Sequence, residues 1–202
     1  SWLFLSLCSA LFLGVYDIFK KRSVNGNAVI PVLFVSTVAS ALVWLPLMLW
    51  SRWSESASEG SLVYVDELEW RDHGFLFLKS CIVAVSWVLS YFGLKHLPVS
   101  VAATIRATGP FWTLLGAIAF LGERPSYQQA AGICLTVFFF FLFSIAGRKE
   151  GIRFHRNKWV LLIVLATLVG AASGLYDKIL LGKMGYRPAT VQAWFSVYLV
   201  VA

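Results

Sequence analysis

The sequence predicts an all-α protein, a polytopic bundle of membrane-spanning helices. Of its 202 residues, 59% are hydrophobic and only 13% are charged, and so small a polar fraction cannot cover the surface of a water-soluble domain of this size. The apolar residues also form runs of about twenty, the helix length that crosses a hydrocarbon core about 30 Å thick. A barrel is excluded because runs such as residues 138–143 lack the alternation of its strands.

Seven such spans are expected along the chain. They cover residues 2–19, 28–50, 74–94, 99–121, 127–146, 159–181 and 189–202. The first is long and is followed by several more, so we interpret it as a span and not as a cleaved signal peptide. Because the chain begins without Met and stops within an apolar run, we expect further protein at both ends.

The links between the spans are polar and mostly basic. Lys20 and Lys21 follow the first span, the basic link 147–158 precedes the sixth, and Trp50 and Trp159 lie at span ends, where indole rings anchor in the membrane interface. The fourth span ends at a turn that contains Glu123, to which we assign a structural role.

The net charge of +7 follows from this distribution and not from a nucleic-acid surface. Basic links between spans are explained by positive-inside retention and by lipid headgroups, and the sequence has no basic stripe with interleaved exposed aromatic residues. The three cysteines lie in separate apolar runs without the close spacing of metal or redox sites. We therefore expect no nucleic-acid partner, no metal and no cofactor.

The chain also repeats itself weakly at an offset of 160 residues. Residues 14–17 then superpose on residues 174–177, and Ser36 on Ser196. Small residues recur at every fourth position in the first span of each repeat, that is, in the first and sixth spans of the chain. This pattern lets helix backbones approach closely in lipid. A repeat of five spans reverses the direction of the second unit, and such inverted repeats are typical of secondary transporters.

Motifs in the third to fifth spans resemble the EamA family of the drug/metabolite transporter superfamily. They are residues 93–103 (GLKHLPVSVAA), Gly109–Pro110, residues 120–125 (FLGERP) and Gly132. The resemblance implies ten helices in two five-helix halves around a central cavity, and transport of small organic metabolites. Residues 1–146 are then the first EamA repeat, 147–158 the link, and 159–202 the start of the second repeat.

Ionisable residues within the apolar spans are the first candidates for a site, because charge in hydrocarbon is unfavourable without a partner. Asp17 lies about 7 Å before the end of the first helix and Arg106 about 10 Å beyond the start of the fourth, on the same side of the membrane. Lys79 and Asp177 share the opposite side. We expect two ion pairs that gate the cavity; alternatively the aspartates lie at interfacial helix ends and Lys79 snorkels to the headgroups.

The fourth and third spans contribute further candidate residues. Helix spacing places Ala102, Arg106, Gly109, Thr113 and Gly116 on one face of the fourth span, where Pro110 interrupts the hydrogen bonds of the helix. Ser80, Ala84, Trp87 and Tyr91 form a stripe on the third, and Trp112 lies on the fourth. These faces are typical of a cavity for amphipathic solutes or for an amine over a ring; packing between helices explains them equally. Tyr16 and Tyr176 accompany the aspartates and are candidates for holding a substrate or orienting the carboxylate.

These features favour a secondary transporter, not an enzyme, that moves amino-acid-like or amphipathic metabolites by alternating access. Asp17 or Asp177 is a candidate for proton coupling, and the bacterial plasma (inner) membrane is the expected location. The alternatives are an integral-membrane enzyme and a non-transporting assembly subunit. The sequence has no cluster of acids, His or Cys at catalytic spacing, and an assembly subunit needs neither buried charge nor an inverted repeat.

Overall fold

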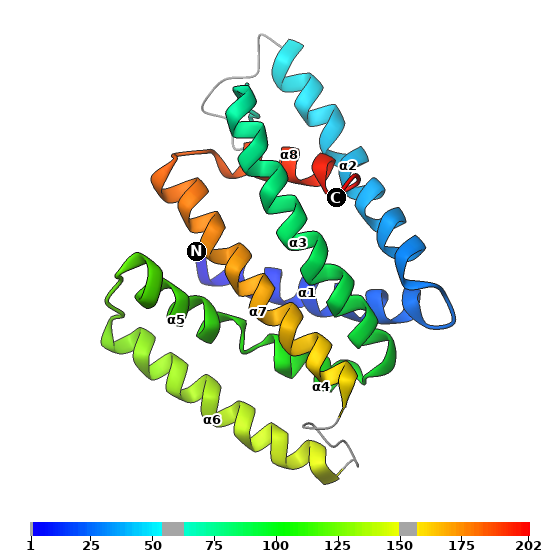
Figure 1. The fold of residues 1–202 in the computed structure, drawn as a ribbon, viewed down its shortest axis with the longest axis vertical. Coiled ribbons are helices and arrows are strands. Elements are labelled where there is room, and N and C mark those ends of the chain that lie inside the picture. The colour runs from blue at the N-terminus through cyan, green and yellow to red at the C-terminus, as the bar shows by residue number, and fades with distance from the viewer. Residues whose placement is uncertain (1, 54–62, 150–156) are drawn as a thin grey trace.

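The computed structural model describes residues 2–53, 63–149 and 157–202 (Figure 1). All regular elements within these ranges are helical, which confirms the all-α membrane bundle. Part of the predicted basic link, residues 150–156, lies outside the described residues.

The helices follow the predicted spans closely. They are α1 (Trp2–Val24), α2 (Val29–Trp53), α3 (Trp70–His96), α4 (Val99–Arg106), α5 (Gly109–Leu121), α6 (Tyr127–Lys149), α7 (Lys158–Lys178), the π-helical turn η2 (Ile179–Lys183) and α8 (Pro188–Tyr198). By length and composition, the described residues contain three helices that can cross a membrane, namely α2, α3 and the continuous segment Lys158–Lys183.

The predicted fourth span is two helices and not one. Pro110 has no backbone N–H to donate to the carbonyl four residues earlier, at Arg106. The helix therefore stops at Arg106 and restarts at Gly109, with the amides of Phe111 and Trp112 bonded to the carbonyl of Thr108. The interruption expected at Pro110 is confirmed, and it leaves a two-residue break inside the bundle.

Equivalent turns follow α1 and η2. Gly26 has φ 77° in the turn from Val24 to Val29, and Gly185 has φ 74° in the turn from Lys183 to Pro188. Both glycines occupy the left-handed region, which residues with a Cβ rarely adopt. The two turns lie 159 residues apart, which agrees with the sequence offset to within one residue; the inversion of the second repeat stays a prediction.

Helices α3 and α7 pack closely through the middle of the bundle (Figure 1). A Cβ on Gly93 would lie 2.5 Å from Cγ1 of the buried Ile163 and 3.1 Å from the carbonyl oxygen of Trp159. Further along, the hydroxyl of Ser86 donates to the carbonyl of Ala166 at 2.8 Å. Small residues and an interhelical hydrogen bond therefore hold the pair together, as expected where lipid supplies no hydrophobic force between helices.

A stripe of small residues was predicted on the first and sixth spans, and the glycines of that stripe lie in close helix contacts on α7 but not on α1. Gly170 lies close to Ser86, and Gly174 lies close to Thr113 of α5. By contrast, a Cβ on Gly14 of α1 would meet nothing within 4 Å.

Helix α1 is fastened to the end of α3 by one side chain. The Lys21 ammonium donates to the carbonyls of Leu94, Lys95 and Leu97 at 2.7, 2.9 and 2.9 Å. Carbonyls at a helix C-terminus lack partners within the helix and carry partial negative charge. Lys21 is thus a packing residue as well as part of a basic link.

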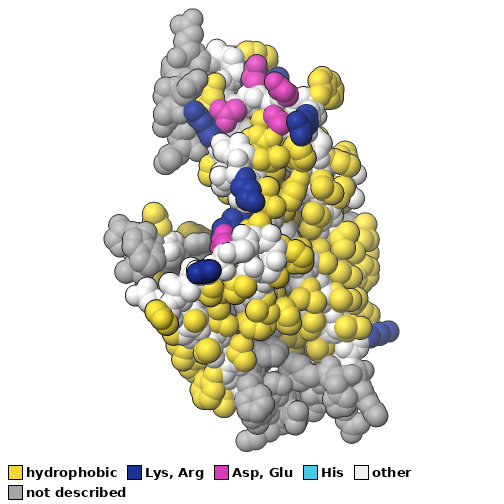
Figure 2. Space-filling model, turned by 60° about the vertical axis from the view of Figure 1, so that its left-hand side comes forward, with side chains coloured by type: hydrophobic (Ala, Val, Ile, Leu, Met, Phe, Trp, Pro, Cys, Tyr) yellow, Lys and Arg dark blue, Asp and Glu magenta, His cyan; other side chains and the backbone are white. Residues whose placement is uncertain are grey.

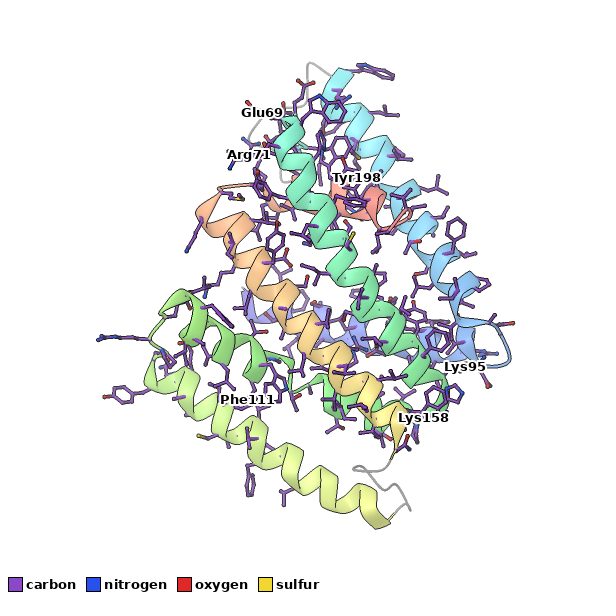
Figure 3. All side chains as sticks on the ribbon, in the orientation of Figure 1. Glu69, Arg71, Lys95, Phe111, Lys158 and Tyr198 are labelled. Atoms are coloured by element: carbon purple, nitrogen blue, oxygen red, sulfur yellow. The ribbon has the colours of Figure 1, made fainter. Side chains whose placement is uncertain are left out.

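The distribution of side chains agrees with a bilayer around the bundle. Figure 3 places Glu69 and Arg71 at one end of α3, and Lys95 and Lys158 near its other end. Between these charged ends the surface is mostly apolar (Figure 2), with exposed side chains such as Leu11 and Phe12.

The α3–α7 contact predicts a strong effect of adding one methyl group. Gly93→Ala should lower the free energy of unfolding by about 1 to 3 kcal/mol, because neither Ile163 nor the backbone at Trp159 has room to move. Gly14→Ala, with open space around it, should be neutral or stabilising by about 0.5 kcal/mol. Thermal unfolding in detergent checks both variants, and equal melting temperatures would contradict the close packing.

Candidate functional site

A cavity of about 630 Å³ lies between α3, α5 and α7. Its lining includes Ser86, Trp87 and Ser90 of α3, Arg106 of α4, Gly109, Pro110, Thr113 and Ala117 of α5, Ala166, Thr167, Gly170 and Lys178 of α7, and Lys20 of α1. Figure 2 shows a hollow in the outline of the molecule where charged side chains interrupt the apolar surface. The cavity has the size of a site for a small organic molecule.

The first expected ion pair is present, and one of its two residues, Arg106, lines this cavity. Nη1 of Arg106 lies 2.6 Å from Oδ1 of Asp17, so the break before Pro110 presents the guanidinium to α1. Both side chains are partly buried, and Arg106 also lines the cavity. Asp17 therefore has a partner on another helix.

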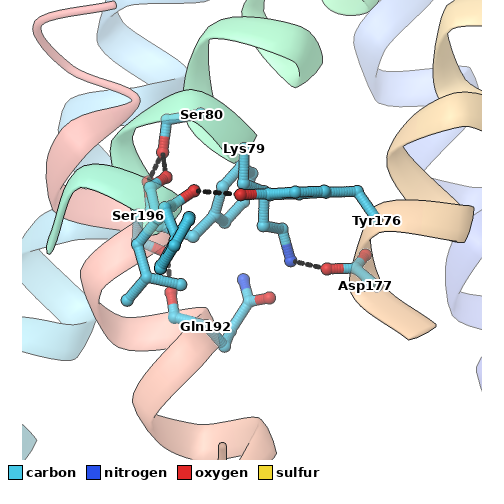
Figure 4. Close-up of polar contacts among 9 residues, drawn as sticks. Lys79, Ser80, Tyr176, Asp177, Gln192 and Ser196 are labelled. Carbon is cyan, nitrogen blue, oxygen red and sulfur yellow. Dashed lines mark hydrogen bonds and ion pairs between the residues drawn. The ribbon is translucent and has the colours of Figure 1, made fainter. Parts of the chain in front are cut away.

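The second expected pair, Lys79 with Asp177, is also present (Figure 4). The side chain of Lys79 is 8% exposed and that of Asp177 is 34% exposed, so Lys79 does not snorkel to the headgroups. The Lys79 ammonium also lies 5.0 Å from the ring centre of Phe195 on α8. The pair joins α3, α7 and α8 and is not part of the described lining of the cavity.

Lys178, the residue after Asp177, lines the cavity, whereas Asp177 does not. Lys178 belongs to the lining and forms an ion pair with Glu123 at 2.5 Å. Sequence reasoning assigned Glu123 to a turn. Gly122, with φ 66°, ends α5 there, and this turn brings the carboxylate to the end of α7. The contact between these two ends depends on tertiary packing, which no local motif reports.

The aromatic residues of the site surround a lysine that sequence reasoning left out of it. The Lys20 ammonium lies 4.1 Å from the ring centre of Tyr91, 5.5 Å from that of Tyr16 and 5.9 Å from that of Trp87. Lys20 is 6% exposed and lines the cavity. The first span was expected to end at residue 19, whereas α1 continues to Val24. The sequence contained one indication of this position: Tyr16 and Lys20 are four residues apart, so on a continuous helix they share one face.

The other candidates divide between the cavity and the packed core. Thr113 lines the cavity and donates its hydroxyl to the carbonyl of Gly109 at 3.1 Å. Ala102 is buried in an apolar cluster with Leu94 and Ile163, and Gly116 lies against Leu175. Both were expected to face the cavity, and both are packing residues, because the break at Ala107–Thr108 ends the continuous face that a single helix would have.

Three of the predicted aromatic and polar residues also lie elsewhere. The hydroxyl of Tyr176 donates to the carbonyl of Phe75 at 3.2 Å, away from the cavity (Figure 4). Trp112 lies over a separate pocket between α5 and α6, with Thr136 and Val137. Ser80 is buried and donates to the carbonyl of Phe195.

A tyrosine outside the spans holds the link between η2 and α8 against the start of α3. The hydroxyl of Tyr186 donates to the carboxylate of Asp72. Burial and this hydrogen bond raise the pKa of Tyr186 to about 12, so the phenol keeps its proton at neutral pH and remains a donor. Over the described ranges, no three His, Cys, Asp or Glu side chains are grouped as a metal site.

The fold and the cavity define the class of the protein as a polytopic helical membrane protein with an internal site of solute size. A family model described as the EamA-like transporter family matches residues 1–145. The chain therefore belongs to the EamA-like transporter family, and it is an integral membrane protein with a transport role. No curated protein and no solved structure matches the chain.

The buried pair predicts a measurable coupling between two helices. Lys79→Met and Asp177→Asn should each lower the free energy of unfolding by roughly 2 to 3 kcal/mol, below the range for a fully buried pair because Asp177 is 34% exposed. The double variant should lose less than the sum, since neither charge is then left alone. Thermal unfolding in detergent measures the cycle, with the exposed Arg124→Gln as control. Additive losses would show that the two side chains do not interact.

Proposed function

We propose that the protein is a secondary carrier that moves small organic metabolites through the α3–α5–α7 cavity by alternating access. The observation that supports this most is a polar and charged chamber inside an otherwise apolar bundle. Irregular backbone at membrane depth is tolerated where it lines such a chamber, and Arg106 and Gly109, which flank the α4–α5 break, belong to its wall.

The proposed closed side lies beyond Arg106. There the ends of α3, α4 and α7 pack into a buried apolar cluster that includes Leu97, Val101 and Val160. At the other end, Lys178 and Glu123 connect the ends of α7 and α5, and both side chains are more than one-third exposed. In one state of an alternating-access cycle, one side of the site is closed and the other is accessible. The buried apolar cluster would close one side, and the exposed Lys178–Glu123 pair would lie at the accessible side.

In this proposal the α4–α5 break is the hinge and Asp17–Arg106 is the contact that opens. Rotation about Ala107 and Thr108 moves α4 without unfolding α5, because Pro110 has no N–H and donates no helical hydrogen bond that would have to break. Opening the pair releases α4 from α1 and separates the packed cluster. The charges remain in a water-filled chamber, where they are less costly than in lipid.

The solute is proposed to be amino-acid-like or amphipathic, and the carrier to function in the bacterial plasma (inner) membrane. The Asp17 carboxylate is the candidate for proton coupling, because it contacts a residue of the cavity wall; Asp177 is a second candidate. Solute-dependent acidification or alkalinisation in sealed vesicles tests the coupling. Flux indifferent to an imposed proton gradient would remove it while leaving the carrier in place.

The gate predicts rescue by charge exchange. Asp17→Arg and Arg106→Asp should each lower uptake of a metabolite panel into proteoliposomes by roughly tenfold or more, because each leaves two like charges in contact at a partly buried position. The double variant restores an opposite-charge pair and should regain a measurable part of the loss.

Lys95→Gln is the matched control, since the Lys95 side chain lies at the end of α3 and donates to the carbonyl of Asn27 in an exposed contact. It should transport as the unmodified protein does. A double variant no more active than the single variants would contradict the gate, and absence of uptake by the unmodified full-length protein would contradict the carrier.

A further inference from the structure

Lys20 is a buried lysine that forms no ion pair with any carboxylate of the described residues. It is 6% exposed, and its ammonium lies over the rings of Tyr16, Trp87 and Tyr91. Ring faces attract a cation and replace part of its lost hydration, but they do not neutralise it. The closest carboxylate on the same helix, that of Asp17, is bound to Arg106.

The wall of the cavity contains one basic residue that has no ion-pair partner among the described residues. Its described charged residues are Lys20, Arg106 and Lys178, and none of the lining residues is an acid. Arg106 is paired with Asp17 and Lys178 with Glu123. Lys20 remains without such a partner in the described part of the chain, at a position where solvent is largely excluded and a bound anion would favour the charged form of the lysine.

Ser90 is a second side chain without a partner at the same wall. Its hydroxyl oxygen is buried and has no hydrogen-bond partner in the described part of the chain, and the residue is 6% exposed. Ser86, one turn earlier on the same face, bonds the carbonyl of Ala166. A buried hydroxyl left unbonded is unfavourable, and an oxygen of a bound anion would satisfy it.

We infer that this wall is an anion site, in which Lys20 and Ser90 hold the carboxylate of a small monocarboxylic acid. The inference rests on the proposed carrier function and narrows its solute to organic anions. One lysine without an ion pair among the described residues matches one negative charge. The rest of the solute would lie against Trp87, Leu114 and Ala171 of the same cavity.

The same geometry disfavours a solute amine. The ring faces of Trp87 and Tyr91, for which an amine was one of the expected ligands, already contact the protein's own lysine. A second cation there would face Lys20 and Arg106 with no lining carboxylate to bind it. A neutral amide would lose the charge-assisted hydrogen bond, which is about twice as strong as a neutral one.

The test separates binding from transport. The full-length protein in detergent is titrated with an acid, the matching amide, the matching amine and a phosphate ester, namely indole-3-acetate, indole-3-acetamide, tryptamine and phenyl phosphate. Monocarboxylates, amides and amines with smaller apolar groups are titrated in the same way. Binding is measured as the rise in melting temperature, which grows with ligand occupancy. We expect a rise for monocarboxylates and none for the matching amides or amines.

Variants then assign the effect to the wall. Lys20→Gln should weaken carboxylate binding by roughly 10- to 100-fold, the loss expected for one charge-assisted hydrogen bond. Ser90→Ala should weaken it less, and Lys20→Arg should retain most of it. Lys95→Gln, outside the cavity, should bind as the unmodified protein does. If Lys20→Gln does not fold, Ser90→Ala and Lys20→Arg decide the question.

Equal binding of acid and amide, preference for an amine or for the phosphate ester, or wild-type affinity in both Lys20→Gln and Ser90→Ala would each overturn the anion site. Uptake into proteoliposomes is scored separately. Uptake of neutral or cationic solutes without binding of carboxylates would refute this inference and leave the carrier intact. Binding of carboxylates without uptake of any solute would refute the carrier and leave the anion site.

Discussion

Close contact between α3 and α7 positions almost every other feature of the molecule. The absence of a side chain at Gly93 lets the two backbones meet, and Ser86 bonds directly to the backbone of α7. Once these helices are fixed, their remaining faces form two walls of the cavity and bring Lys79 to Asp177. Attraction between helices in lipid comes from packing and hydrogen bonds, so a small loss of fit here affects the whole bundle.

The charged residues in the bundle have different environments, and the differences define their roles. Lys79 meets a carboxylate beside an aromatic ring, and Lys21 is bound by three backbone carbonyls. These arrangements are complete and join helices. Lys20 is surrounded by rings and has no ion pair among the described residues, so it has capacity for a further partner. A structural lysine is bound by a carboxylate or by backbone carbonyls, whereas a candidate binding lysine has neither. This comparison separates the two roles better than the number of charges does.

The break between α4 and α5 links the packing to the proposed transport cycle. It presents Arg106 to α1 and the glycine and proline of α5 to the cavity. The same break turns Ala102 into the packed cluster at the end of the bundle. Helix α4 thus has one end in that cluster and the other end at the cavity. Movement of so short a helix could open the closed side of the site in the proposed cycle.

Several features were determined by the sequence itself. Its apolar runs predict the helices, Pro110 predicts the break, and counting rise per residue along the spans predicts both ion pairs, because depth in a membrane depends mainly on position along a helix. The rotation of each helix about its axis was decided only by the tertiary structure. Lys20 therefore enters the cavity while Gly116 and Trp112 face other helices, since rotation is set by neighbouring helices that are distant in the chain.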